Sequence, residues 1–423
     1  MAVRAMKNWR DASGIIVLSG ALKYARAPTL LSKLGDLGEN PLIVPLEETG
    51  KTEWEVALVK RSSKTGFFAN SYVFPGGRLD AADSSPEWQK LFSRSSSGDP
   101  FRSILAPSGS HSNQRLPLYR EVPRGPILGE VAFRICAARE LFEEAGVLLA
   151  RDESEVSAVS EWVPGTFPPA VKTLERDQLD HWRDRVHNDA TEFLNLCSEL
   201  RCVPDIWSLL EWSDWLTPRN FHIRYDSVFY LCVLDTLPPI TADGSEIVDA
   251  KWYTPSEALQ LHADSKIVIT PPQFVDIHVL KSLGSVPCLH SYALRKNLSR
   301  SLYRHNKIRI LTKDKVTVSM IDLDDLYPAL PEELALTSPP PHLPRSPTLS
   351  HVHLHPSQSP AHEYECPTHT ADELRNSSTR LCRMESHGKG NFQLYDTIMA
   401  EQITSHVNEY NRFKEANQLT SRL

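Results

Sequence analysis

Apolar residues divide this chain into short strand-like runs, longer helical stretches and a polar C-terminal region. Three early runs, Gly14–Leu18, Trp54–Lys60 and Ser71–Phe74, have the residue types and the alternation that are typical of strands. Asp226–Leu234 is almost continuously apolar, which predicts a central strand buried on both faces. Ile247–Tyr253 is predicted to form another strand.

Other segments have the period of a helix. Leu128–Leu149 is predicted to be one helix, and its apolar stripe consists of Val131, Ile135, Ala138, Leu141 and Phe142. Residues 151–212 are expected to be a helical insert that caps or packs the domain, because Val171–Leu200 has apolar residues at helical spacing. Thr254 is predicted to cap a helix whose first residue is Pro255.

The candidate chemistry lies on the first of these helices. Glu140, Glu143 and Glu144 have an i, i+3, i+4 spacing, so the helix presents all three carboxylates on one face. Like charges in such a stack repel one another and raise their own pKa values unless a cation lies against them. Hard oxygen ligands suit Mg²⁺ or Mn²⁺, and Gly146 is expected to end the helix just beyond the cluster.

Two motifs in this region resemble the halves of the Nudix box, Gly-x5-Glu-x7-Arg-Glu-U-x-Glu-Glu-x-Gly-U with U aliphatic. The second half is complete, and its matching residues are Arg139, Glu140, Leu141, Glu143, Glu144, Gly146 and Val147. The first half is displaced: Phe74-Pro75-Gly76-Gly77 resembles the glycine turn, and Asp83 stands where a Glu is usual. Between Gly77 and Arg139 lie 61 residues, against 13 in the uninterrupted motif, so about 48 have been inserted.

Because the motif is split by an insertion, the residue that takes the place of its first Glu is not obvious. Segment 81–128 is polar and turn-rich, so it is expected to be a surface loop that is dispensable for folding. The position eight before Arg139 is Val131, with Glu130 one step off register. Asp83, Glu130 or neither of them replaces the missing Glu.

The resemblance implies an α/β fold, a Nudix α/β/α sandwich with a mixed sheet, helical insertions and a partly disordered C-terminal tail. The expected divisions are a Nudix domain at 10–285 (with insertions at 81–128 and 151–212), a C-terminal extension at 286–336, a low-complexity linker at 337–390 and a tail at 391–423. The linker contains Ser338-Pro339-Pro340-Pro341-His342. Phe392–Leu419 is expected to be weakly helical.

Composition narrows the class of protein. The net charge of −7 provides no basic footprint for nonspecific nucleic-acid binding. The seven cysteines have no CxxC spacing, and they fit a reducing compartment better than a disulfide framework or a zinc site. No apolar run reaches the 18 or so residues that span a bilayer, so no membrane span is expected.

A split box of this kind resembles the peroxisomal acyl-coenzyme A diphosphatase branch of the Nudix hydrolases. The resemblance implies hydrolysis of the diphosphate of CoA and acyl-CoA esters to (acyl-)phosphopantetheine and adenosine 3′,5′-bisphosphate. Two alternatives are a Nudix diphosphatase for NADH, ADP-ribose or another nucleotide, and an inactive nucleotide-binding protein of the same fold. The intact glutamates at 140, 143 and 144 argue against the inactive alternative.

The resemblance also implies roles for residues. Glu140 and Glu144, with Glu143, would bind Mg²⁺ or Mn²⁺, which neutralises the phosphoryl oxygens and helps to deprotonate water. The general base is either Glu143 or Glu246, and Arg139 orients a helix carboxylate, touches phosphate or forms a structural salt bridge. Gly76 and Gly77 are expected to allow positive φ and close backbone approach to the bound group.

Four cations are candidates for the 3′-phosphate of CoA: Lys60, Arg61, Lys64 and Arg224. A CoA signature known in some Nudix proteins has a Gly four residues before the Phe of the glycine turn. This chain has Asn70 there instead.

Both ends of the chain contain residues that resemble targeting signals. Ser421-Arg422-Leu423 resembles the C-terminal Ser-Lys-Leu type of peroxisomal signal, which would be bound by the peroxisomal import receptor. The basic residues among the first 35 faintly resemble a mitochondrial transit peptide, which makes the mitochondrion the alternative. The peroxisome is the expected location, because the first predicted strand lies inside that basic stretch and would be lost with a cleaved segment.

Overall fold

The computed structural model describes most of the chain. The described residues are 9–20, 54–96, 98–105, 116, 118–119, 127–159, 163–218, 221–298, 304–321, 355–356, 364–376, 382–387 and 392–420. No helix in this part of the chain is long and apolar enough to cross a membrane.

One large mixed sheet organises the fold, in the order β10-β2-β1-β9-β8-β11-β12-β15-β16. The strands along this path are β1 (Arg10–Ser19), β2 (Glu55–Arg61), β8 (Leu210–Leu216), β9 (Tyr225–Leu234), β10 (Ile247–Tyr253), β11 (Arg304–Thr312), β12 (Thr317–Ile321), β15 (Cys382–Ser386) and β16 (Phe392–Asp396). Beside the path, β3 (Tyr72–Val73), from the run predicted at 71–74, pairs with β2. Strand β1 pairs in parallel with β9, and β8 pairs in parallel with β11, whereas the other pairs along this path are antiparallel. The strands predicted at 14–18, 54–60, 226–234 and 247–253 are all present, and β9 is central as expected.

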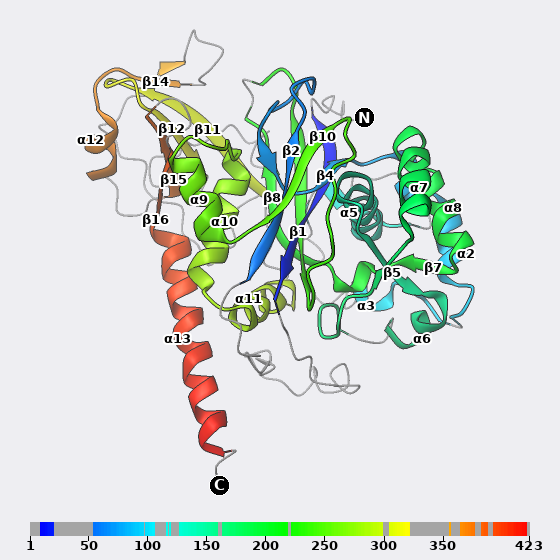
Figure 1. Ribbon diagram of the computed structural model, residues 1–423. Coiled ribbons are helices and arrows are strands. Elements are labelled where there is room, and N and C mark those ends of the chain that lie inside the picture. The colour runs from blue at the N-terminus through cyan, green and yellow to red at the C-terminus, as the bar shows by residue number, and fades with distance from the viewer. Residues whose placement is uncertain are drawn as a thin grey trace, which may run out of the picture.

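Helices cover both faces of this sheet (Figure 1). On one face lies α5 (Gly129–Ala145). On the other lie α9 (Pro255–Ala263), α10 (Pro271–Leu283) and α11 (Val286–Leu298). The predicted α/β/α sandwich is therefore confirmed, and Thr254 caps α9 with Pro255 at its first position, as the sequence indicates.

The alternation of side chains along β1 explains why this strand is apolar on both faces. Ile15 and Val17 belong to the core shared with α5, whereas Ile16 and Leu18 belong to the core shared with α10 and α11. A strand between two helical layers has no solvent-exposed face, so the apolar residues run without interruption.

Two predicted helical segments need correction. Helix α5 ends at Ala145, where Gly146 adopts a left-handed φ of 73°, so the residues up to Leu149 are not helical. Leu148–Asp152 is strand β5, which pairs with β6 (Val171–Lys172) and β7 (Cys202–Pro204) in a second small sheet. Within the described residues of 151–212, the longer helices are α7 (Arg176–Asn188) and α8 (Glu192–Glu199), and the short α6 (Val156–Val159) precedes them. The segments at 171–172 and 202–204 are strands instead.

The insertion at 81–128 is not a simple surface loop. It contains η1 (Ala81–Ser84), α2 (Pro86–Phe92) and α3 (Arg102–Leu105). Trp88 and Phe92 are fully buried: the Trp88 ring lies 5.9 Å from Phe193 of α8, and the Phe92 ring lies 5.6 Å from Trp207. The expectation of a surface loop is therefore wrong, because the aromatic residues of the insertion form part of the core next to α5, and this burial argues against the expectation that the segment is dispensable.

Removal of one of these rings tests whether the insertion contributes to the hydrophobic core. Phe92→Ala is expected to lower the free energy of unfolding by about 3–5 kcal/mol, since it leaves a cavity where a buried ring packed. Lys90→Ala on the same helix is the control, because Lys90 is 72% exposed and pairs only with Glu87 across the surface. Urea denaturation of both variants gives the comparison. Equal stabilities would show that the insertion contributes nothing to the core.

The C-terminal part is more ordered than its composition predicts. Within the expected linker at 337–390, the described residues form β13 (His355–Pro356), β14 (Tyr364–Cys366), α12 (Ala371–Asn376) and β15, so these pieces are not a structureless linker. The run of prolines at 339–341 lies outside the described residues. The expected weak helix divides into strand β16 and helix α13 (Thr397–Thr420), which leads away from the body in Figure 1. Ser421-Arg422-Leu423 lies outside the described residues.

Candidate active site

The three carboxylates of α5 lie against the glycine turn, as the split motif predicts. Strand β4 (Gly76–Arg78) pairs with β1, and this pairing places the turn over the helix. The backbone N–H of Gly76 donates to Glu144 Oε2 at 2.8 Å. A Cβ atom on Gly77 would lie 2.4 Å from the Glu140 carboxylate. The helix and the turn therefore form one acidic site.

Close approach is the reason why both turn positions must be glycine. A Cβ atom on Gly76 would lie 2.6 Å from both the Cα of Gly14 and the carbonyl oxygen of Ser13 on β1. At Gly77 the obstacle is the Glu140 side chain itself. The backbone of Gly76 has a positive φ of 159°, whereas Gly77 has no positive φ. The sequence-based expectation of close approach is therefore confirmed at both positions, and the expected positive φ is present at Gly76 but not at Gly77.

Arg139 joins the two halves of the split motif. Its Nε and Nη2 atoms donate to the two carboxylate oxygens of Asp83 at 2.8 and 2.9 Å. Its Nη1 atom donates to Glu143 at 2.7 Å and to Glu140 at 2.9 Å. Only 4% of Arg139 is exposed. A planar guanidinium with five donors can orient three carboxylates at once, so Arg139 is a positioning residue for the acidic face.

The structure also decides between Asp83 and Glu130. Asp83 is 1% exposed, and besides Arg139 it accepts the backbone N–H of Asp80, which holds the start of η1. Glu130 stands in the first turn of α5, ten residues before Glu140, which is about 15 Å along a helix. Of the two candidates, Asp83 is therefore the carboxylate that contacts the acidic site, through its ion pair with Arg139.

The acidic face carries more negative charge than the neighbouring cations balance. Burial raises the pKa of Glu140 from its usual 4.5 to about 7, although Arg139 opposes the shift. Burial also raises the pKa of Glu143, against the effect of Arg139, and it raises the pKa of Glu144 well above its usual value together with the charge of Glu140. Buried carboxylates of this kind take up protons unless another cation binds.

These residues fit a divalent cation by their chemistry. In the described part of the chain, no three His, Cys, Asp or Glu side chains are already arranged as a metal site. Glu140, Glu143 and Glu144 nevertheless provide oxygen donors on one face, with negative charge in excess. Mg²⁺ uses a small number of carboxylates and completes its shell with water and substrate phosphate, so a fully assembled protein cage is not required.

Both candidates for the general base line the cavity beside α5. Glu143 is 9% exposed, and one of its oxygens accepts from Arg139. Glu246 is exposed just before β10, and its backbone carbonyl accepts from Ser62. Its charge adds to the rise in the pKa of Glu143. The two carboxylates thus lie near each other, as the sequence-based alternatives require.

Of the four cations considered for phosphate, Arg61 alone lines this cavity. Its Nε donates to the carbonyl of Phe67 at 3.1 Å, and its charge opposes the rise in the Glu144 pKa. Lys60 lies over the Tyr72 ring, and Lys64 is exposed. Arg224 is buried and bonds to the carbonyl of Thr217. Asn70, the residue that departs from the CoA signature, has a φ of 62°, a conformation that a glycine would also adopt.

Helix α7 supplies two residues that the sequence did not single out. Arg183 donates through Nε and Nη2 to the carbonyl of Glu143 at 3.0 and 2.6 Å, and Thr241 N–H donates to the carbonyl of Ala145. These bonds satisfy carbonyls in the last turn of α5. His187 lines the cavity 3.9 Å from Glu143. Arg183 lies 40 positions after Glu143 in the sequence, so no local pattern indicates their contact.

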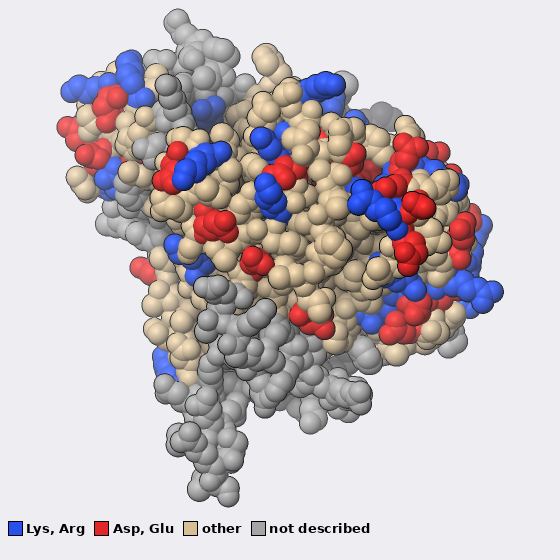
Figure 2. All heavy atoms as spheres, in the orientation of Figure 1, with Lys and Arg blue, Asp and Glu red and all other residues tan. Residues whose placement is uncertain are grey.

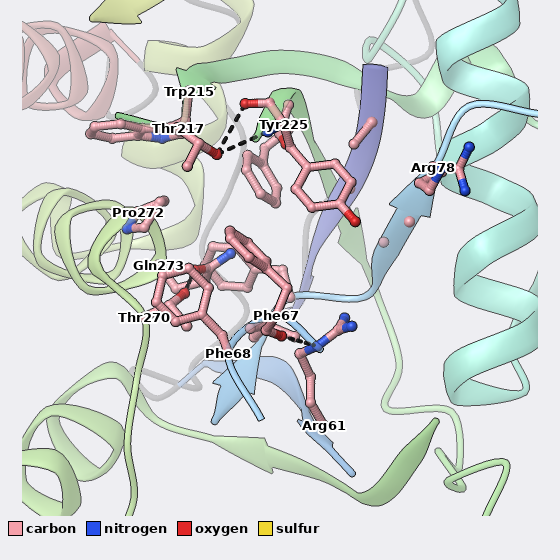
Figure 3. Close-up of a pocket in the computed structure, with 18 of the residues that line it drawn as sticks. Arg61, Phe67, Phe68, Arg78, Trp215, Thr217, Tyr225, Thr270, Pro272 and Gln273 are labelled. Carbon is pink, nitrogen blue, oxygen red and sulfur yellow. Dashed lines mark hydrogen bonds between the residues drawn. The ribbon is translucent and has the colours of Figure 1, made fainter. Parts of the chain in front are cut away.

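The cavity continues well beyond the carboxylates. It has a volume of about 880 Å³ and extends from α5 to the first residues of α10 and to the C-terminal strands. Figure 3 shows Phe67 and Phe68 lying between Arg61 on one side and Trp215, Thr270 and Gln273 on the other. The rings of Phe67 and Tyr225 are 5.1 Å apart. The acidic end is thus joined to a long aromatic compartment.

Known proteins resemble this chain over most of its length. The family model of the NUDT19 Nudix domain matches residues 9–280. The acyl-coenzyme A diphosphatase NUDT19 of Xenopus laevis is 32% identical over 334 residues, which cover 77% of this chain and 83% of that protein. Proteins of the same name are 35% identical in Gallus gallus (77% of this chain, 82% of that protein) and 36% identical in Homo sapiens (73% and 81%).

Proposed function

The chain belongs to the NUDT19 family of Nudix hydrolases, and from this premise we propose that it hydrolyses the diphosphate of coenzyme A and acyl-CoA esters. The products are phosphopantetheine, or its acyl ester, and adenosine 3′,5′-bisphosphate. The observation that carries the proposal is the continuity of one cavity from the carboxylates of α5 to an aromatic compartment. A CoA ester has a diphosphate between two bulky ends, so its substrate site must extend beyond the acidic face.

The cofactor follows from the family and from the donor set. Nudix hydrolases use divalent metal ions, and we propose Mg²⁺ or Mn²⁺ for this chain, held by Glu140 and Glu144 with Glu143. When bound, the ion neutralises phosphoryl charge and makes water a better nucleophile. Arg139 and Asp83 hold the carboxylates in place, and Gly76 and Gly77 let the backbone lie close to the bound phosphate.

The remaining residues position the substrate and move the proton. Water adds to one phosphorus atom, the bridging oxygen leaves with the other phosphate, and a carboxylate takes the proton from the attacking water. Arg61, at the edge of the acidic face, is placed to bind a phosphate group. The rings of Phe67 and Phe68 line the compartment beside it and would pack against the substrate.

A substrate panel tests this function. The purified full-length chain with Mg²⁺ or Mn²⁺ is assayed against CoA, a series of acyl-CoA esters, NADH and ADP-ribose, with products identified by mass. The expected result is a kcat/KM for CoA or acyl-CoA at least about tenfold above that for the other nucleotides. Preference for NADH or ADP-ribose would overturn the substrate assignment and leave the diphosphatase chemistry intact. No turnover of any compound would favour an inactive binding protein.

The pH dependence of two variants separates the candidate bases. If Glu246 is the base, Glu246→Gln lowers kcat by about 10²–10⁴-fold and removes the acidic limb of the pH profile, while metal affinity is kept. If Glu143 is the base, Glu143→Gln has that effect, and Glu246→Gln changes kcat only a few-fold. Metal affinity, measured by titration of Mn²⁺, distinguishes the loss of a ligand from the loss of a base.

For location, we propose that Ser421, Arg422 and Leu423 direct the chain to peroxisomes when they form a free C-terminus. A fluorescent protein fused to the N-terminus is expected to leave import intact, and removal of the three residues is expected to disperse the fusion through the cytosol. An untagged chain, followed by antibody, checks that the fusion does not mask an N-terminal signal. Colocalisation with mitochondria alone would contradict the proposal.

A further inference from the structure

We propose that strands β12, β15 and β16 form the end of the active-site cavity that receives the acyl chain, so that preference for chain length resides in the part of the chain that follows the Nudix domain. The proposal rests on the proposed function and deepens it. These strands follow residue 280, where the match to the family's Nudix domain ends. They nevertheless supply lining residues of the same cavity that contains Glu140 and Glu144.

The register of these strands shows that they present one continuous face to the cavity. Thr317 pairs with Ser386, and Ser386 pairs with Phe392. Ser319 pairs with Met384 in the same way. Alternate residues of a strand point to the same side of a sheet, and all five of these residues line the cavity. The large sheet therefore runs without a break from β1, which pairs with the strand of the glycine turn, to these C-terminal strands.

The cavity-facing side of β12, β15 and β16, here called the C-terminal wall, packs against helices α9 and α10 of the Nudix domain. Phe392 stacks on His262 of α9 at 5.2 Å and meets Phe274 of α10 at 5.7 Å. The first residues of α10 also provide Pro271 and Pro272 to the cavity. The C-terminal strands are thus held against rigid elements, which is the arrangement that fixes the size of a pocket.

The chemistry of this end favours an alkyl chain. Every carboxylate among the described lining residues comes from positions 80–246, at the acidic end. The C-terminal wall provides Met384, Phe392 and small hydroxyl side chains, with Arg309 as its single charged contribution among the described residues. Methionine is flexible and apolar, so it can adapt to chains of different length. The guanidinium of Arg309 lies 5.8 Å over the Phe221 ring.

The opposite orientation, with the nucleotide at this wall, fits less well. Adenosine 3′,5′-bisphosphate carries two phosphates after cleavage, and phosphate sites generally combine several cations and backbone donors. The cations Arg61 and Arg78 lie at the acidic end, with the glycine turn close by. The cations at the acidic end can therefore bind the 3′-phosphate. The apolar end is then left for the acyl-pantetheine arm.

Ser386→Trp tests the proposal in the full-length chain. A ring at position 386 is expected to fill the apolar end, so that kcat/KM for dodecanoyl-CoA falls by about tenfold or more while that for free CoA stays within about twofold. Gln393→Trp is the matched control, since Gln393 is exposed and neighbours Phe392 on β16 without lining the cavity. Phe392→Ala provides the converse change, and it is expected to shift the preference toward longer chains. Circular dichroism and the melting temperature confirm that each variant is folded.

The possible results separate this proposal from the function on which it rests. Equal losses for CoA and dodecanoyl-CoA in Ser386→Trp, or no loss for either, would overturn the acyl-end assignment although the enzyme remains a CoA diphosphatase. A weakened inhibition by adenosine 3′,5′-bisphosphate in Ser386→Trp, with chain-length preference unchanged, would place the nucleotide at this wall and also overturn it. Failure of the proposed function would be evident in the unmodified chain, as absence of CoA turnover.

Discussion

Glu140→Gln and Glu144→Gln are each expected to lower kcat for diphosphate hydrolysis by about 10³-fold or more while the protein stays folded. Glutamine keeps the shape of the side chain but removes one negative charge and a strong oxygen donor. Glu144 would also accept the Gly76 N–H more weakly, since a neutral amide oxygen replaces a carboxylate. Steady-state assays with saturating Mg²⁺ measure the loss, with Glu87→Gln, at a residue 50% exposed on α2, as the control.

The same Glu140 variant is expected to be more stable than the unmodified chain when metal is removed. Burial raises the pKa of Glu140 to about 7, so between pH 4.5 and 7 the folded state holds a proton that the unfolded state releases. The contribution of this group to folding is therefore most favourable below pH 4.5, and it is lost as pH rises through 7. At pH 8 in a chelator, glutamine removes this penalty and raises the unfolding free energy by on the order of 2 kcal/mol.

Thermal unfolding with and without Mg²⁺ tests whether Glu140 binds the metal. Added metal is expected to raise the melting temperature of the unmodified chain more than that of Glu140→Gln, because a ligand stabilises the state that binds it. Turnover within a few-fold of normal in either glutamine variant would remove the acidic face from the mechanism. A variant that loses activity and also fails to fold would be replaced by Glu140→Asp, which keeps the charge and withdraws it from Gly77.

Asp83→Ala is expected to have the second largest effect, on both stability and activity. It leaves the Arg139 guanidinium buried without its bidentate partner, and such a loss typically costs about 3–5 kcal/mol. Arg139 would then be free to turn, so Glu140 and Glu143 would lose their fixed orientation. We expect a cooperative melt at a lower temperature and a large fall in kcat that added Mg²⁺ does not restore.

An exposed ion pair provides the control for this prediction. Arg176 and Asp180 form a 3.0 Å contact on α7, with their side chains 74% and 55% exposed, on a face where Figure 2 shows acidic and basic groups intermixed. Asp180→Ala should change the unfolding free energy by less than about 1 kcal/mol. Asp83→Glu is expected to recover most of the lost activity, because it keeps the charge opposite Arg139. Similar stabilities for Asp83→Ala and Asp180→Ala would contradict the role of Asp83.

Short sequence patterns were sufficient to predict many elements of the Nudix domain. The apolar run at 226–234 had to be buried on both faces, and it is β9, with a neighbour on each side. Thr254 followed by Pro255 is a signal contained in two residues, and the structure begins α9 there. The i, i+3, i+4 spacing of the glutamates needs only a helix to bring them together. Each of these features depends on residues a few positions apart.

The predictions failed for segments in which the hydrophobic periodicity is weak, and this has a physical reason. Helix α2 has seven residues, which is too short for a hydrophobic period to stand out, and its buried aromatic residues are separated from the rest of the insertion core by polar turns. Strands β12 and β15 each carry two lining residues and β16 carries one, and their burial depends on partners far away in the chain. Pairings of this kind are not encoded in any window of sequence.

The sequence by itself determined the family, the acidic helix and the glycine turn, because these rest on short patterns whose spacing reflects one element. Only the tertiary structure decided that Asp83 serves Arg139 across 55 intervening residues, that Arg183 satisfies carbonyls at the end of α5, and that Arg61 alone of four cations lines the cavity. It also decided that the extension beyond residue 280 closes the cavity. Contacts between distant segments arise from the packing of whole layers, so they become visible only when the layers are in place.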